Sequence, residues 1–329
     1  MNLATLATAL RASRGFAHKT DIADVMKRLA PSLPSDVPVG DDCAAIPDGD
    51  GHLLFAIEGF VEDFVERMPW FAGWCGVMVN ASDIYAMGGR PIAVADALWG
   101  EGAGQTGPLL DGLAEASRRY GIPIVGGHSN HRSPRGQLAV AIVGRAKALL
   151  SSFAAHPGDA LVMAVDLRGA WQEPYPYWNA ATTAPAGRLR ADLELLPAIA
   201  EAGLSCAAKD ISMAGAVGTA LMLLECSRCG GVIDVGAMPR PASVAPDDEA
   251  AMLRWLSAFP SYGFLLSVAP AHVGAVLERF AARDIAAAVV GEVRAGSAVD
   301  LRDGDDVAAL WDFADQPFIT AGVQVESAA

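Results

Sequence analysis

The chain has 329 residues, of which 52% are hydrophobic and 19% are charged, and its formal net charge is −14. This length is enough for two domains with substantial cores, and the apolar content excludes a disordered chain. The negative charge argues against nucleic acid or an anionic membrane as the main partner, because phosphate groups demand clustered lysines and arginines.

The amino-terminal residues 1–14 are amphipathic and lack the unbroken apolar core of a signal peptide. No apolar run reaches the ~20 uncharged residues that are needed to span a bilayer. We therefore expect a soluble, cytoplasmic protein. The five cysteines, an odd number in a long chain, favour reduced thiols, and the pair Cys226 and Cys229 lacks the second ligand pair of a zinc site.

Residues 15–19 are predicted to form a short loop before a helix that is capped by Thr20 or Asp21. A lysine in front of a helix can bind phosphate, because its ammonium group and the unpaired backbone amides converge there. Lys19 is therefore a candidate phosphate ligand. A lysine that simply faces solvent gives the same pattern.

Two adjacent carboxylates, Asp41 and Asp42, follow Gly40 between apolar residues, which is unlike a solvated run of charges. Neighbouring side chains of an extended segment point in opposite directions, so at most one of them faces a shared site unless the glycine bends the chain. The next predicted strand, residues 53–58, ends in the carboxylate of Glu58.

A long apolar helix is predicted for residues 70–89, between Pro69 and a glycine pair. It is apolar almost all round, which predicts burial on several sides. Its polar residues Asn80 and Asp83 are three apart and so share one face.

A buried carboxylate such as that of Asp83 needs a partner, which can be backbone amides, an opposite charge or a metal ion. Asp41, Asp42 and Glu58 are likewise acidic residues at the boundaries of apolar segments. Carboxylates that gather in one place usually hold a hard cation. The sequence therefore predicts a Mg²⁺ site that is formed by these four residues.

The first half of the chain is completed by one expected helix at residues 109–120 and by three expected strands at residues 91–99, 121–127 and 137–145. Residues 102–107 match the dinucleotide pattern G-x-G-x-x-G, but the next strand ends in Gly126-Gly127-His128 and not in the acid that holds a ribose. We interpret residues 102–107 as a flexible turn, and a dehydrogenase is the least favoured function.

An aromatic, proline-rich loop at residues 171–185 interrupts the pattern and is a candidate lid, binding loop or structural flap. Helices and strands then alternate without a strict βαβ period, which favours an α+β fold. We expect four helices at residues 188–203, 215–229, 246–258 and 271–283. We expect three strands at residues 231–235, 263–268 and 286–293. The predicted organisation is an N-terminal domain at 1–152, a C-terminal domain at 153–315 and a loose tail at 316–329.

Five segments in this order resemble the aminoimidazole ribonucleotide synthetase, or PurM-like, superfamily, which includes thiamine-monophosphate kinase, selenophosphate synthetase and the hydrogenase-maturation dehydratase. Together they are specific, and the similarity spans roughly residues 15–295; in overall character the chain resembles the synthetase-related branch. The segments are Gly40–Ala44, Val79–Gly89, Gly121–Gly127, His156–Asp159 and Lys209–Ser212.

The resemblance implies a two-domain PurM-like α+β fold in which the N-terminal sheet pairs with that of a second subunit to form a barrel in a homodimer. It implies ATP near the dimer interface, with Mg²⁺ bridging its phosphates to acidic residues. The implied site residues are metal-binding Asp41, Asp42 and Asp83, phosphate- or water-binding Asn80, phosphate-binding Lys19, the glycine turn Gly126 and Gly127, and Asp210 from the second domain.

Three positions depart from the family pattern: Glu58 and His128 stand where relatives carry Asp, and Met213 replaces the second acid of an Asp-x-Ser-Asp segment. Imidazole is a poor Mg²⁺ ligand, so His128 indicates one metal fewer, a softer metal, an acid/base catalyst or a core histidine. The leading hypothesis is ATP- and Mg²⁺-dependent phosphoryl transfer to, or phosphate activation of, a small metabolite. The alternative is a nucleotide-binding homodimer without catalysis, acting as a sensor or scaffold.

Overall fold

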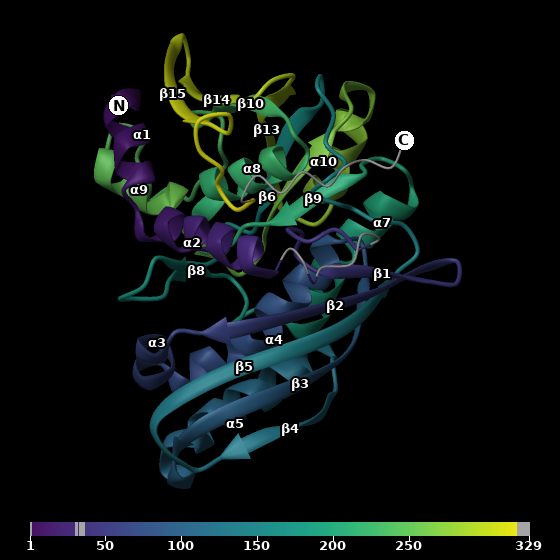
Figure 1. Cartoon of the computed structure of the whole chain (residues 1–329), viewed down its shortest axis with the longest axis vertical. Coiled ribbons are helices and arrows are strands. Elements are labelled where there is room, and N and C mark those ends of the chain that lie inside the picture. Colours follow the sequence, from purple (N-terminus) through teal and green to yellow (C-terminus); the bar gives the residue numbers. More distant parts are fainter. Residues whose placement is uncertain (1, 30–31, 33–36, 321–329) are drawn as a thin grey trace. The chain divides into compact units, whose positions relative to one another are not determined.

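The structure is a computed structural model that describes residues 2–29, 32 and 37–320 (Figure 1). It divides into two compact units, each built from separate stretches of chain. The five-stranded unit comprises Asp42–Leu149 and Thr183–Glu201. The seven-stranded unit comprises the chain up to Asp41, Leu150–Thr182 and the chain from Ala202 onward.

The five-stranded unit is a sheet with strand order β1-β2-β5-β3-β4, in which β3 and β4 are parallel and the other neighbours are antiparallel. Helices α4 and α5 lie on one face of this sheet in Figure 1. The strands are β1 (Ala44–Asp48), β2 (Gly51–Phe60), β3 (Arg90–Glu101), β4 (Ile124–Asn130) and β5 (Arg132–Ala146); the helices are α3 (Glu62–Arg67), α4 (Pro69–Ala86), α5 (Gly102–Tyr120), α6 (Ala186–Leu193) and α7 (Leu195–Glu201).

The seven-stranded unit has the strand order β15-β14-β10-β13-β6-β12-β9 and a small second sheet with the order β11-β8-β7. Its strands are β6 (Ala160–Val165), β7 (Ala170–Trp171), β8 (Tyr177–Asn179), β9 (Ala207–Asp210), β10 (Gly230–Asp234), β11 (Phe259–Pro260), β12 (Gly263–Val268), β13 (Ala286–Arg294), β14 (Ala298–Asp303) and β15 (Asp306–Asp312). Its helices are α1 (Leu3–Arg11), α2 (Arg14–Leu29), α8 (Gly215–Cys226), α9 (Glu249–Leu256), α10 (Val273–Ala281) and the short 3-10 helix η2 (Pro270–His272).

The mixed arrangement of helices and strands confirms the predicted α+β class. The division of the chain differs from the predicted boundary at 152, because the chain passes between the units more than once. Helices α1 and α2 bury Leu3, Leu10 and Phe16 in the core of the seven-stranded unit, so the amino-terminal residues belong there. None of the described helices is long and apolar enough to cross a membrane.

The first residues of the predicted loose tail, 316–320, are not loose. The buried Glu225 carboxylate on α8 accepts hydrogen bonds from the backbone amides of Phe318 (2.7 Å) and Ile319 (2.8 Å), and both side chains are buried. Residues 316–320 are therefore held against the seven-stranded unit. The remainder of the predicted tail, 321–329, lies outside the described residues.

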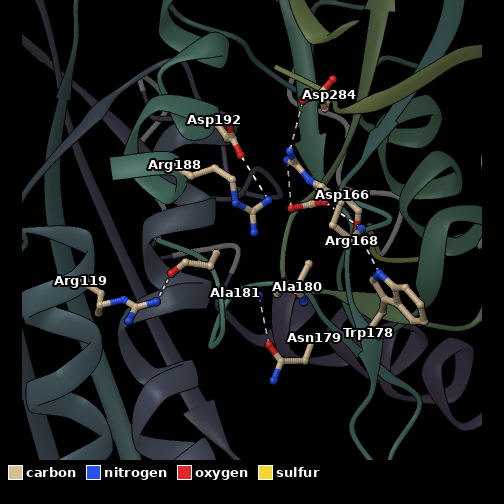
Figure 2. Close-up of polar contacts among 12 residues, drawn as sticks. Arg119, Asp166, Arg168, Trp178, Asn179, Ala180, Ala181, Arg188, Asp192 and Asp284 are labelled. Carbon is tan, nitrogen blue, oxygen red and sulfur yellow. Dashed lines mark hydrogen bonds and ion pairs between the residues drawn. The ribbon is translucent and has the colours of Figure 1, made fainter. Parts of the chain in front are cut away.

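The aromatic loop at 171–185 is a packed flap. Trp171, Trp178 and Trp255 contact one another edge to face, with ring centroids 5.4 to 6.0 Å apart. The indole of Trp178 donates a hydrogen bond to the carbonyl oxygen of Asp166 (2.9 Å), as Figure 2 shows. These contacts favour the structural-flap interpretation of the loop.

The predicted helix at 70–89 is confirmed as α4, which starts with Pro69 and buries residues 71–86. It crosses α5 at two glycines. A Cβ atom added at Gly73 would lie 2.0 Å from the carbonyl oxygen of Leu109, and one added at Gly112 would lie 1.9 Å from that of Trp70. Only glycine at both positions allows the two backbones to approach this closely.

The predicted flexible turn at 102–107 is wrong, because these residues form the first turns of α5. The Thr106 hydroxyl donates to the carbonyl oxygen of Gly102 (3.1 Å), and Leu109 and Leu113 farther along are buried. Packing of the apolar side of α5 thus outweighs the low helix propensity of its glycines.

We expect Gly112→Ala to destabilise the protein by about 1 to 3 kcal/mol, because the added methyl group forces α4 and α5 apart. Gly107→Ala is a matched control on the same helix, since no atom lies within 4 Å of a Cβ there. The control should be neutral or stabilising by up to about 1 kcal/mol. Urea unfolding measures both, and equal midpoints for the two variants would contradict the close crossing.

Candidate functional site

The polar residues of α4 lie in its last turns. Asn80 is fully buried and Asp83 is nearly so. The Asn80 amide nitrogen donates to the carbonyl oxygen of Gly76 (2.8 Å), whereas its side-chain oxygen has no hydrogen-bond partner among the described residues. A buried acceptor left unsatisfied costs about 1 to 3 kcal/mol, so this oxygen marks a place for a donor or a cation.

Asp42 supplies a second carboxylate beside Asp83. Oxygens of the two side chains lie within 4.8 Å of each other. Mg²⁺ holds its oxygen ligands at about 2.0–2.1 Å, so one ion can contact two ligands that are about 4 Å apart. Together with the unsatisfied oxygen of Asn80, one helical turn earlier on the same face, the pair offers only oxygen donors, which suits a hard cation.

Asp41 has different surroundings from its neighbour Asp42. Its carboxylate accepts hydrogen bonds from the Ser151 hydroxyl (2.8 Å), the Ser152 amide (2.9 Å) and the Ser152 hydroxyl (2.6 Å), all within the seven-stranded unit. The two adjacent carboxylates thus lie in separate environments, although residues 39–43 form a bend and not an extended strand. Both oxygens of Asp41 are engaged in holding residues 151–152.

Glu58 does not join Asp42 and Asp83. It is opposite Val140 on β5, and Val140 lies beneath Gly76 of α4. Ile84, which follows Asp83, lies instead over Gly144. Four residues along β5 are about 13 Å, so Glu58 and Asp83 belong to different levels of the sheet.

Glu58 belongs to a row of residues that pair across the sheet at Val140. The same row contains Asp96 on β3, a carboxylate that was not among the predicted site residues. Glu58 and Asp96 both pair with Val140, so their side chains point to the same face of the sheet. Burial raises the pKa of Asp96 above its usual range, and a hydrogen bond from its own backbone amide opposes this shift. The signal in the sequence was a single acid inside the apolar run 92–98.

The glycine pair and His128 lie on β4. A Cβ atom at Gly127 would lie 2.6 Å from the carboxylate of Asp96, which explains the glycine there. His128 pairs with Ala97, which in turn pairs with Ala139, and its ring lies 6.2 Å from that of Trp99. His128 is exposed and points to the sheet face opposite to α4, so it is not a core histidine.

Lys19 is not in front of a helix N-terminus, contrary to the prediction. Helix α2 begins at Arg14, and the Phe16 amide donates to the Ser13 hydroxyl (3.3 Å) at its start. The predicted loop is helical because Phe16 is buried against α8. Lys19 therefore contributes a charge but no adjacent unpaired amides.

Asp210 ends strand β9 in the seven-stranded unit and is buried, as is its neighbour Lys209. Met213, at the position of the missing acid, is 39% exposed. Of the predicted set, the five-stranded unit thus brings together Asp42, Asp83 and Asn80. None of the five cysteines forms a disulfide bond in the part of the chain that the structure describes.

Asp41→Asn should destabilise the protein more than Asp42→Asn in metal-free buffer. Asp41→Asn places an amide nitrogen against serine donors and should cost about 1 to 3 kcal/mol. Asp42→Asn relieves the repulsion between the carboxylates of Asp42 and Asp83, so it should cost less. Urea unfolding in EDTA compares them, and equal losses of stability would contradict the separate surroundings of the two residues.

Asp96→Asn should raise the melting temperature at pH 7 by about 1 to 3 °C. Because the folded-state pKa of Asp96 is raised, the ionised carboxylate destabilises the fold above its unfolded pKa. The gain should therefore shrink as the pH falls from the raised folded-state pKa toward the unfolded pKa, and it should be absent below the unfolded pKa. Glu58→Gln, an exposed acid in the same row, is the control; a gain independent of pH would refute the assignment.

Two sequence profiles match the chain. The N-terminal domain profile of AIR synthase related proteins matches residues 40–146, and the C-terminal domain profile matches residues 180–304. An uncharacterised protein of Synechocystis sp. is 44% identical over 96% of this chain and 97% of its own length. An uncharacterised protein of Methanocaldococcus jannaschii is 33% identical over 95% of this chain and 98% of its own length.

More distant similarities reach proteins whose names state an activity. A thiamine-monophosphate kinase of Synechococcus elongatus is 27% identical over 84% of this chain and 91% of its own. The structure of T. maritima PurL complexed with ATP matches 98% of this chain with a TM-score of 0.75 at 20% identity. This chain spans 52% of that PurL chain, and the likeness establishes the shared fold.

Proposed function

Since the chain belongs to the AIR synthase related protein family and has its two-domain PurM-like fold, we propose that it is an ATP- and Mg²⁺-dependent enzyme. It would transfer a phosphoryl group to a small metabolite or activate a metabolite as a phosphate. The observation that carries the proposal is the pair Asp42 and Asp83 beside the unsatisfied oxygen of Asn80. Two relatives support ATP as the nucleotide: a thiamine-monophosphate kinase and a PurL whose structure was solved with ATP.

In this proposal Asp42 and Asp83 hold Mg²⁺, and Asn80 accepts a hydrogen bond from a metal-bound water or contacts the ion. Bound Mg²⁺ supplies the positive charge that neutralises the phosphate oxygens during transfer. The burial of Asp83 and Asn80 on α4 keeps bulk water away from these ligands, which strengthens their electrostatic interactions. Gly126, Gly127, Lys19 and Asp210 stay proposed contributors to nucleotide binding, and Asp41 is proposed to position the segment that carries Asp42.

We propose a homodimer that pairs the open faces of two five-stranded sheets. The side chains on this face include Phe55 and Ile57, 45% and 63% exposed, which lie opposite Val143 and Ala141. Exposed apolar side chains on neighbouring strands favour a protein partner over solvent. His128 points to the same face and would be enclosed by the second copy.

The second candidate function is a nucleotide-binding homodimer that has lost catalysis. It is favoured by His128 and Met213, which stand where the resemblance expects acids. Metal-dependent formation of ADP from ATP in the presence of a metabolite extract, lost in Asp83→Asn, would exclude this function. Binding of ATP without any turnover would favour it.

Calorimetric titration of ATP tests the proposal directly. The wild-type protein should bind ATP in the presence of Mg²⁺, and Asp83→Asn should weaken binding at least tenfold, because it removes a charged ligand from the ion. Asp48→Asn is the control, since Asp48 is exposed and pairs with Arg145 (2.8 Å) elsewhere in the unit. Binding that is independent of Mg²⁺, or unchanged in Asp83→Asn, would count against the assigned metal ligands.

A further inference from the structure

Residues 316–320 form a strap that is fastened to the end of α8 in the seven-stranded unit. The buried Glu225 carboxylate accepts hydrogen bonds from successive backbone amides of this strap. The donors are Phe318 (2.7 Å), Ile319 (2.8 Å) and Thr320 (3.2 Å). A buried carboxylate destabilises a fold unless it is hydrogen-bonded, and successive backbone amides can bind an anion together. Glu225 and the strap therefore depend on each other.

The strap is also held at its beginning. The indole of Trp311 donates a hydrogen bond to the carbonyl oxygen of Gln316 (2.8 Å). The ring of Trp311 packs edge to face on that of Phe318, with centroids 5.2 Å apart. Phe318 is fully buried and also packs on Phe16 of α2 at 5.1 Å. The strap thus has one fixed position within its unit.

Ile319 of the strap lies beside Gly40, two residues before Asp42. A Cβ atom added at Gly40 would lie 4.0 Å from Ile319 Cδ1 and 3.3 Å from Cys226 Sγ, with the ring of Phe153 at 3.7 Å. The Cys226 thiol donates a hydrogen bond to the Gly40 carbonyl oxygen (3.5 Å). Gly40 has a φ angle of 131°, which residues with a side chain rarely adopt. These three side chains therefore surround the bend that leads into Asp42.

The end of α8 holds the partner of Asp41 as well. The Asp41 carboxylate accepts hydrogen bonds from the amide (2.9 Å) and the hydroxyl (2.6 Å) of the fully buried Ser152. The Ser152 carbonyl oxygen in turn accepts a hydrogen bond from the Ser227 hydroxyl (2.6 Å). The consecutive residues 225–227 thus hold the strap, Gly40 and Ser152, which together fix both residues that precede Asp42.

All of these contacts lie within the seven-stranded unit, whose first stretch ends at Asp41, and Asp42 is the next residue. Mg²⁺ demands a near-ideal octahedral geometry, so its carboxylate ligands must be held to within about 0.5 Å. Because Asp42 is bonded to Asp41, a shift of Gly40 or Asp41 displaces the Asp42 carboxylate. The end of α8 therefore contributes to the position of this ligand.

We propose that Glu225, acting through the strap and Gly40, is a positioning residue for the metal ligand Asp42. This inference rests on the proposed function, in which Asp42 and Asp83 hold a divalent cation. Both oxygens of Glu225 are engaged by amides of the strap, so its role is to place a ligand and not to be one. Its loss should weaken metal binding while both carboxylate ligands remain.

Hydrogen exchange followed by NMR in EDTA tests the coupling without a metal. Glu225→Gln keeps the size of the side chain but turns an NH₂ group toward the amides of the strap. The reporter is the Ser152 amide, which donates to Asp41 (2.9 Å) and should exchange about tenfold faster in this variant. Unchanged exchange of this amide would show that Asp41 is held independently of Glu225 and would overturn the inference.

Titration of Mn²⁺ alone into the full chain, followed by electron paramagnetic resonance, measures the consequence for the metal site. The wild-type protein should bind an ion that is lost in Asp83→Asn. Glu225→Gln should weaken Mn²⁺ binding about fivefold because the geometry of the site is relaxed. Ile319→Ala, which leaves Glu225 in place and removes the Cδ1 atom beside Gly40, should weaken it about threefold.

Ser261→Ala is the matched control for a general loss of stability. The buried Ser261 hydroxyl accepts a hydrogen bond from the Ala180 amide (2.8 Å) elsewhere in the same unit. The control should change Mn²⁺ affinity by less than about twofold, because distant sites act independently. Circular dichroism at the temperature of the titration verifies that each variant is folded, and Ile319→Ala decides the question if Glu225→Gln is not.

The outcomes separate this inference from the proposed function. A wild-type protein that binds no Mn²⁺ would overturn the proposed metal site and this inference with it. Binding by the wild type that is lost in Asp83→Asn but unchanged in Glu225→Gln and Ile319→Ala would overturn this inference alone. A loss in Ser261→Ala equal to that in Glu225→Gln would also overturn it, because stability and not position would then govern the affinity.

Discussion

The close crossing of α4 and α5 at Gly73 and Gly112 is the constraint on which the five-stranded unit depends. With no side chain between the backbones, α5 packs closely on the first turns of α4, while β2 and β5 cover another side, and residues 71–86 of α4 are buried. A carboxylate placed there cannot be solvated by bulk water and must be satisfied by a specific partner. The burial of Asp83 is thus a consequence of the packing of its helix.

The acidic residues of the chain consequently divide into different roles. Asp42 and Asp83 come together, Asp41 holds backbone and hydroxyl donors of residues 151–152, and Glu58 shares a row with Asp96.

The sequence was sufficient to predict α4, the shared face of Asn80 and Asp83, and the superfamily, because these depend on local periodicity and on ordered motifs. It could not separate Asp41 from Asp42, since their environments are set by Ser151 and Ser152, more than a hundred residues away. The start of α2 and the helical glycines of α5 were missed because tertiary burial of Phe16 and Leu109 outweighs local propensity. Strand register, which the sequence alone does not show, decides that Glu58 and Asp96 lie in one row, on either side of Val140.

The central claim is that Asp42 and Asp83 hold a divalent cation. The most direct test is a crystal grown with Mn²⁺ and a non-hydrolysable ATP analogue, in which anomalous scattering locates the ion. The account predicts an anomalous peak with ligands from both carboxylates and with the Asn80 side-chain oxygen turned toward the ion or its water. Ordered nucleotide with no peak between Asp42 and Asp83, or with Mn²⁺ held only by other residues, would contradict it.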